Sequence, residues 1–359
     1  MKNRIIIAFV SAGILGSLTS GCNTTAKVAE STVTFEQSGP YKGDEDVFAR
    51  PSGEVLKGGV NGDSGGTLHM LVGPAAKAFN ERERVSVRGG ASIHTVAWDP
   101  ETLGDTQFFR TFSRYGAPGL LESKSLEDWK FHRVDYLGKN SRSFLATNQK
   151  DAALVQTLEK NGRILLVSAG QKDSTKDFEL GEEFGKAGPM SPSGVLNAEG
   201  DLHLAAAVQT ETPGEYKIVY SLIQDSGSTQ TQEFPGKRAY LRSDSQALYL
   251  AVLEPQGRAS TLTLRKSMDE GKNWQIVSSR PYEGLTNEFD FLVNDKCQLL
   301  AWMNGQNVNL SYSLDNGSSW TEAEAVGEKC AKYDAFLSTS TVGVSELGSK
   351  GVEIYKGTL

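Results

Sequence analysis

The sequence predicts an all-β protein folded as a β-propeller, and three observations carry this prediction. A Ser-x-Asp-x-Gly-x-x-Trp pattern occurs twice, forty-six residues apart. Short apolar runs recur about every 45 residues, which is the period of a four-stranded propeller blade. The 359 residues include 38 glycines, and clusters of Gly, Asn, Asp and Ser separate the apolar runs, as turns separate short strands.

Each residue of the repeated pattern has a role in a tight hairpin. The serine and aspartate can hydrogen-bond within the turn, the glycine permits a left-handed backbone, and the tryptophan can bury a large ring between neighbouring blades. The two copies consist of Ser267, Asp269, Gly271 and Trp274, and of Ser313, Asp315, Gly317 and Trp320. We therefore expect all eight residues to be structural.

The apolar runs set the expected number of blades. We expect seven of them to be the inner strands of seven blades. They are Leu68–Val72, Phe108–Phe112, Ile164–Val167, Leu202–Val208, Leu248–Val252, Leu299–Trp302 and Thr341–Val344. Six blades is the alternative, because residues 44–90 are irregular and can hold only part of a blade.

The two ends of the chain are expected to close the ring. Residues 334–356 supply three candidate strands, and residues 33–37 can supply a fourth, which removes an exposed sheet edge. The sequence thus predicts one propeller domain over residues 31–359.

The N-terminus has the layout of an export signal. Lys2 and Arg4 precede a largely apolar stretch, and small residues lead to Gly21 and Cys22. Residues 1–21 are therefore predicted to be a signal peptide of the lipoprotein type, with Cys22 as the lipid anchor and residues 22–30 as a tether. Asn23 follows the cysteine, where Asp is associated with inner-membrane retention, so the outer membrane is the expected location. Ordinary secretion is the alternative.

The charge of the chain argues against nucleic-acid partners. The formal net charge is −7, and removal of the signal peptide makes it more negative. Such a surface repels phosphate backbones. No phosphate-binding loop is evident, and the four histidines are scattered singly, so we expect no cofactor and no metal site.

Two cysteines remain after Cys22 is assigned to the anchor. Cys297 and Cys330 can form a disulfide in an oxidising compartment. The alternative is two separately buried thiols.

The two hairpin motifs resemble the Asp-box, or bacterial neuraminidase repeat, of a propeller family that includes sialidases and sortilin-type receptors. The resemblance is specific over residues 236–326 and diffuse elsewhere. It implies that Asp269 and Asp315 are structural and not catalytic.

The sialidases of this family need three arginines that clamp the carboxylate of the sugar, a Tyr paired with a Glu, and an Asp acid/base. The first arginine normally lies in a Phe-Arg-Ile-Pro motif. The nearest match here is Phe48-Ala49-Arg50-Pro51, in which the arginine is displaced by one position. A shift of one residue turns a strand side chain to the other face, so Arg50 is the one ligand candidate from the resemblance, and an ordinary loop arginine is the alternative.

These observations favour a non-catalytic propeller in the bacterial envelope that binds a protein or a glycan. The alternative is an exo-sialidase or a related glycoside hydrolase. The two hypotheses differ in whether an arginine cluster with a Tyr and an acid lies at one mouth of the central channel.

Overall fold

The computed structural model describes the strands of the chain and most of the turns from residue 190 onward. The described residues are 27–28, 33–41, 46–49, 55–62, 68–74, 83–84, 87–88, 95–103, 106–112, 118–124, 129–132, 134, 141–148, 151–158, 163–170, 174–179, 184, 190–224, 226–256, 259–285, 288–326, 330–349 and 351–359. The expected signal peptide with Cys22, most of the expected tether, and Arg50 lie outside these residues.

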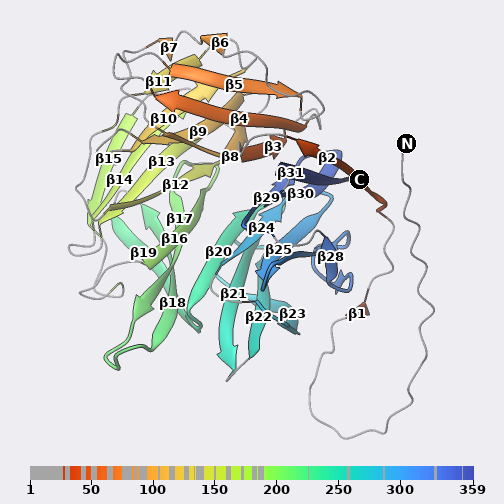
Figure 1. The fold of residues 1–359 in the computed structure, drawn as a ribbon. Coiled ribbons are helices and arrows are strands. Elements are labelled where there is room, and N and C mark those ends of the chain that lie inside the picture. Colours follow the sequence, from red (N-terminus) through yellow and green to blue (C-terminus); the bar gives the residue numbers. More distant parts are fainter. Residues whose placement is uncertain are drawn as a thin grey trace, which may run out of the picture.

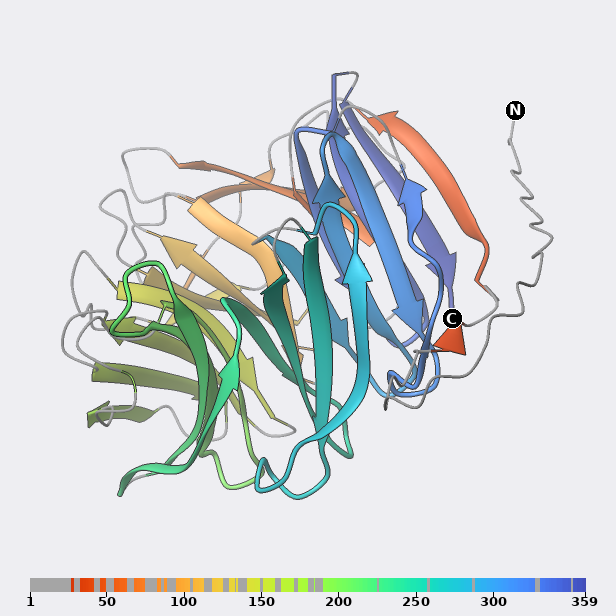
Figure 2. The same cartoon turned by 90° about the horizontal axis from the view of Figure 1, so that it is seen from below.

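The described residues form β-strands, and no α-helix occurs among them. They form seven sheets of four or five strands and one two-stranded pair. Figures 1 and 2 show the larger sheets set side by side around a common axis. The fold is therefore an all-β propeller, as the sequence predicts.

The first three sheets come from the N-terminal half of the chain. The first contains β3 (Asp46–Ala49), β4 (Val55–Gly62), β5 (Leu68–Pro74) and β6 (Glu83–Arg84). The second contains β7 (Val87–Arg88), β11 (Trp129–His132), β10 (Pro118–Ser123), β9 (Thr106–Phe112) and β8 (Thr95–Leu103), in that spatial order. The third contains β12 (Ser141–Thr147), β13 (Asp151–Leu158), β14 (Arg163–Gly170) and β15 (Ser174–Glu179).

Three further sheets follow in chain order. They are β16 (Met190–Leu196), β17 (Leu202–Gln209), β18 (Tyr216–Gln224) and β19 (Gly227–Pro235); β20 (Arg238–Ser243), β21 (Leu248–Gln256), β22 (Ala259–Ser267) and β23 (Gln275–Tyr282); and β24 (Phe289–Val293), β25 (Gln298–Asn304), β26 (Asn307–Ser313) and β28 (Glu324–Val326).

The seventh sheet joins both ends of the described chain. β2 (Phe35–Tyr41) pairs with β31 (Gly351–Thr358), which continues into β30 (Thr341–Gly348) and β29 (Lys332–Leu337). Phe35 lies opposite Gly357 in this antiparallel pairing. The N-terminal strand therefore covers an edge that the three C-terminal strands would otherwise expose.

Apolar clusters hold neighbouring sheets together. Leu253 and Leu264 of the β20–β23 sheet pack with Phe291, Leu300 and Trp302 of the β24–β28 sheet. Similar apolar clusters join the other neighbouring sheets, from the β8–β11 sheet through the C-terminal sheets to the β3–β6 sheet. Because β3 and β4 also lie against β8, the ring is closed.

The expectation that the seven apolar runs are inner strands is wrong. The runs fall on the second strands β9, β17, β21, β25 and β30 and on the third strands β5 and β14. In β17, every residue from Leu202 to Val208 is buried, because neighbouring sheets cover both faces. The strands nearest the axis have polar residues on the side that faces the cavity, so they do not stand out as apolar runs.

Both repeated motifs form the same hydrogen-bonded turn. Ser267 Oγ donates to Asp269 Oδ1 at 2.8 Å and accepts from the amide of Gly271 at 2.8 Å. The second turn has equivalent distances of 2.8 Å from Ser313 to Asp315 and 2.9 Å from Gly317 to Ser313. The shared pattern explains why serine, aspartate and glycine recur at fixed spacing.

The carboxylate of Asp269 is held within its own turn. The amide and the side chain of Asn273 donate to it at 2.9 and 2.6 Å. These hydrogen bonds, first the one from the Asn273 side chain, lower the pKa of Asp269 below its ordinary value. Its acceptor positions are used for structure.

The two tryptophans pack against the sheet that precedes their own. The Trp274 ring meets Tyr220 edge-on at 5.1 Å between centroids and also lies near Phe234. Trp320 is buried in the cluster that contains Leu262 and Leu264. Each hairpin therefore secures a contact between sheets as well as its own turn.

The expected disulfide between Cys297 and Cys330 is not formed. Both cysteines are free and buried, Cys297 just before β25 and Cys330 just before β29. The Cys330 thiol donates to the carbonyl of Lys332 at 2.8 Å, and burial raises the pKa of Cys297 to about 12. Both cysteines act as small apolar residues of the core between two sheets. No helix among the described residues is long and apolar enough to cross a membrane.

Candidate functional site

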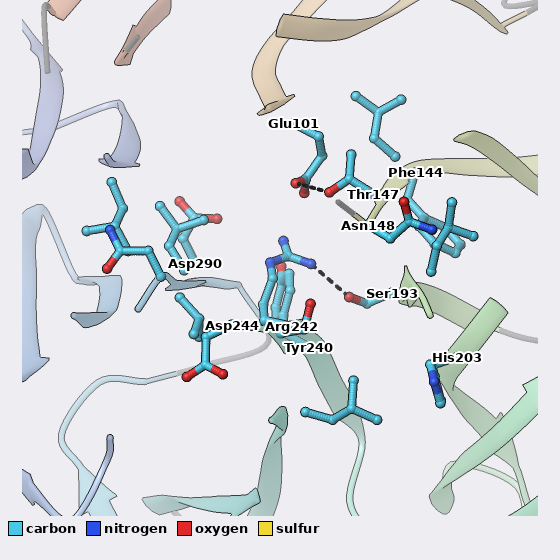
Figure 3. A pocket seen from close by; sticks show the side chains of 18 of the residues that line it. Glu101, Phe144, Thr147, Asn148, Ser193, His203, Tyr240, Arg242, Asp244 and Asp290 are labelled. Carbon is cyan, nitrogen blue, oxygen red and sulfur yellow. Dashed lines mark hydrogen bonds between the residues drawn. The ribbon is translucent and has the colours of Figure 1, made fainter. Parts of the chain in front are cut away.

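A cavity of about 1500 Å³ lies at the centre of the ring. Residues of β3, β8, β12, β16, β20, β24 and β29 line it, together with the turns that follow several of these strands. Figure 3 shows polar side chains from several strands around this space. Because each sheet contributes to the wall, residues from Val47 to Thr339 meet in one place.

The strand β20 presents two arginines and a tyrosine to the cavity. Ala239 and Leu241 are buried between sheets, at 1% and 0% exposure. Side chains alternate along a strand, so Arg238, Tyr240 and Arg242 lie on the opposite face, and all three line the cavity. We call these three residues the β20 stripe.

Hydroxyl groups hold both guanidinium groups of the stripe. Arg238 donates from Nη1 to Ser191 Oγ at 2.8 Å and from Nη2 to Tyr240 Oη at 2.9 Å. Arg242 donates from Nη1 to Ser193 Oγ at 3.1 Å. The guanidinium carbons lie 5.2 and 5.6 Å from the centre of the Tyr240 ring, within the range of cation–π attraction.

The neighbouring strand β16 is distorted where it meets the stripe. Its pairing with β17 is irregular between Met190 and Ser193, and Ser191 has a φ of 47°. A left-handed serine in a β-bulge is strained, and bulges of this kind redirect side chains near functional sites. Here the distortion accompanies the contact between Ser191 and Arg238.

The charges of the stripe are not neutralised by nearby acids. Within the part of the chain that the structure describes, no carboxylate lies within ion-pair distance of Arg238 or Arg242. Among the described residues, Arg242 donates hydrogen bonds from Nη1 alone, to Ser193 and to the carbonyl of Leu241. Its remaining donors are available on the guanidinium that Figure 3 shows pointing into the cavity.

Acidic side chains also line the cavity, on other strands. Asp290 belongs to β24, Asp334 to β29 and Glu101 to β8. Glu101 accepts from Thr147 Oγ1 at 3.3 Å, and Asp334 lies 3.8 Å from Lys332 Nζ. Two further arginines, Arg110 of β9 and Arg142 of β12, also line the cavity, and Asp244 lines it just after β20. Basic and acidic groups therefore both occur on several strands around the wall.

A second tyrosine at the cavity, Tyr333, is suited to structure rather than reaction. Its hydroxyl donates to the carbonyl of Ala301 at 3.1 Å. Burial, followed by the charge of Asp290, raises its pKa far above the ordinary value. The hydroxyl stays protonated and engaged in its hydrogen bond.

His203 is a neutral part of the cavity wall. Burial lowers its pKa to about 4, and its ring stacks on Tyr220 at 6.0 Å. Tyr220 Oη donates to the carbonyl of Glu270 at 3.2 Å and lies 2.8 Å from Nδ1 of His203. Since the tyrosine hydrogen is used for Glu270, Nδ1 carries the proton of the neutral imidazole.

The residues predicted from sequence are mostly elsewhere. Arg50 lies outside the described residues, and of the eight hairpin residues only Ser267 borders the cavity. No group of three potential metal ligands occurs among the residues with described positions. The stripe was not predicted from the sequence, although its alternation of Arg, Ala, Tyr, Leu and Arg is typical of a strand with one polar face.

Comparisons with known proteins identify the fold alone. No family model and no curated protein matches the chain. Among solved structures, the BP39L lectin from Burkholderia pseudomallei is similar over 88% of this chain and 96% of its own, with 13% identity and a TM-score of 0.51.

Two further solved structures have lower scores. A Trypanosoma rangeli sialidase matches 90% of this chain and 59% of its own, with 11% identity and a TM-score of 0.44. A putative 6-phosphogluconolactonase from Bacteroides uniformis matches 82% and 92%, with 12% identity and a TM-score of 0.49.

Proposed function

We propose that the protein is a lipid-anchored propeller of the bacterial envelope that binds an acidic glycan in its central cavity without catalysis. The single observation that carries the proposal is the β20 stripe. Its two guanidinium groups flank a tyrosine, and neither has a carboxylate partner among the described residues. Planar guanidinium groups bind carboxylates bidentately, so an acidic sugar is a suitable ligand.

The arrangement around the stripe supports recognition. Ser193 is 4% exposed and fixes Arg242 before any ligand arrives, which reduces the entropy lost on binding. Neutral hydrogen-bonding side chains, including Asn148 and Asn197, line the same cavity and suit sugar hydroxyl groups. The lectin likeness is compatible with this proposal, and the proposal rests on the site.

In this account each of the seven sheets is one blade, and the two repeated hairpins are Asp-boxes of the family they resemble. The sheet inventory and the hydrogen bonds of Ser267 and Ser313 support these assignments. Cys22 carries the lipid, residues 22–30 are the tether, and the outer membrane is the site of attachment.

Calorimetric titration of the mature protein tests the ligand class. Oligosaccharides that end in sialic or uronic acid are compared with neutral oligosaccharides of the same length. We expect binding of the acidic series only, with affinity that weakens as salt is added, because exposed charges are screened. Equal binding of the neutral series would exclude the stripe as the basis of recognition.

The anchor is tested separately by cell fractionation. We expect Cys22→Ala to move the protein from the membrane fraction to the soluble periplasm. An unchanged membrane fraction for this variant would refute lipid attachment at Cys22.

An exo-sialidase or a related glycoside hydrolase is the second candidate. The observation that favours it is the hydrogen bond from Arg238 to the hydroxyl of Tyr240, which holds a potential nucleophile in place at the cavity. Fluorogenic sialosides test this candidate. Turnover by the wild type that Tyr240→Phe abolishes would establish the enzyme and overturn the non-catalytic proposal.

A further inference from the structure

The tips of the two repeated hairpins expose large apolar side chains. Met268 is 64% exposed and Leu314 is 45% exposed. They occupy the same place in the two motifs, between the serine and the aspartate, in neighbouring sheets. We call this pair the hairpin tips. Met268 also lines the central cavity, and Leu314 does not.

The N-terminal segment lies beside one of these hairpins. β1 (Lys27–Val28), labelled in Figure 1, pairs in parallel with β27 (Ser319–Trp320), and Lys27 lies opposite Ser319. β27 leads away from its hairpin tip, so a parallel β1 also leads away from it. The N-terminal end of β1 therefore faces the side of the tip.

The distance from the anchor position to this pair is short. Cys22 precedes Lys27 by five residues, which span at most about 18 Å when fully extended. A lipid on Cys22 therefore holds the hairpin end of the propeller close to the bilayer. Isolated exposed apolar residues are common on proteins, and it is this proximity that gives the pair a specific partner.

We propose that the hairpin tips rest on the lipid surface that holds Cys22 and so fix the orientation of the propeller. This inference depends on the lipid anchor of the proposed function. The anchor keeps the tips at high effective concentration near the bilayer, so two apolar side chains suffice to orient the domain.

The charges beside the hairpin tips select the kind of lipid surface. Asp269, Glu270 and Asp315 lie in the two turns, and Lys272 is the one base among the turn residues 267–273 and 313–319. These acidic residues repel anionic headgroups, so the hairpin tips suit a zwitterionic lipid surface.

The orientation places the two ends of the stripe at different distances from the membrane. In an antiparallel sheet of successive strands, the turn after the first strand and the turn after the third lie at the same end. β20 therefore begins, at Arg238, at the end opposite the hairpins. Arg238 therefore lies at the end of β20 farther from the membrane, and Arg242 lies at the end nearer to it.

Site-specific labelling of the lipidated protein tests the inference. Met268→Cys and Leu314→Cys are each labelled with an environment-sensitive fluorophore in phosphatidylcholine vesicles that contain a lipid-borne quencher. Thr212→Cys is the matched control, because Thr212 is exposed in the β17–β18 turn, which lies at the opposite end of its sheet. The native thiols Cys297 and Cys330 are buried and react slowly.

We expect both tip probes to be quenched about threefold more than the control probe, as for side chains at the headgroup boundary. Phosphatidylglycerol vesicles should give a smaller difference. Vesicle flotation separates the possible failures. A protein that does not float refutes the anchor and, with it, this inference. A protein that floats with equal quenching at all three positions refutes the orientation alone.

Discussion

Ser193 fastens Leu241 across the boundary between two sheets. Its hydroxyl donates to the carbonyl of Leu241 at 3.2 Å and accepts from the amide of the same residue at 3.1 Å. The same oxygen accepts from Arg242, so one buried hydroxyl both joins β16 to β20 and orients the arginine of the stripe.

Ser193→Ala should therefore weaken both stability and binding. The substitution leaves the buried amide and carbonyl of Leu241 without their side-chain partner, and we expect a loss of about 1–3 kcal/mol in the free energy of unfolding. Urea denaturation measures this loss. Ser226→Ala is the control, because Ser226 is exposed between β18 and β19, and it should stay within about 0.5 kcal/mol of the wild type. Equal effects of the two variants would show that the Ser193 contact is unimportant.

Gly271 is expected to tolerate no side chain. It has a φ of 80°, and an added Cβ would lie 1.7 Å from the hydroxyl of Tyr220. Gly214 has a φ of 85° with open space around it, so Gly214→Ala carries the backbone strain alone. We expect Gly271→Ala to reduce the free energy of unfolding by at least about 2 kcal/mol more than Gly214→Ala. Similar losses would indicate that the hairpin can move away from Tyr220.

His203 should make the protein sensitive to acid. Its pKa in the folded state is about 4, against 6.5 for an unperturbed histidine. Between about pH 6.5 and about pH 4, the His203 imidazole is protonated in the unfolded chain and still neutral in the folded protein. The free energy of unfolding therefore falls as the pH drops through this range, by up to about 3 kcal/mol.

Urea denaturation between about pH 7 and about pH 4.5 measures this effect. His203→Gln keeps a hydrogen-bond donor without the titration, so its stability should change less over the same range. Parallel profiles for the two proteins would contradict the assigned role of His203.

The sequence predicts the hairpins well because their bonds are local. Ser267, Asp269 and Gly271 satisfy one another within a few residues, so the pattern specifies the turn before the rest of the chain is considered. The inner strands could not be assigned in this way. Apolar runs report burial on both faces, and in the ring that condition falls on second strands such as β17 and β21.

The stripe could be recognised as part of a site only once the arrangement of the closed ring was known. Arg238 and Arg242 show the alternation of a half-buried strand, but which face meets a cavity depends on sheets that are distant in the sequence. Their serine partners lie 47 and 49 residues away, at Ser191 and Ser193. No local pattern connects them, and the bulge at Ser191 has no clear signature in the sequence.

The affinity of Arg242→Ala for an acidic oligosaccharide, measured by titration calorimetry, tests the central claim most directly. Lys217→Ala is the matched control, because it removes a positive charge from an ion pair with Glu233 on β18 and β19, outside the cavity lining. We predict at least a tenfold loss of affinity for Arg242→Ala, about 1.4 kcal/mol, and an unchanged affinity for Lys217→Ala. Wild-type affinity in Arg242→Ala, or the same loss in both variants, would contradict acidic-glycan binding at the β20 stripe.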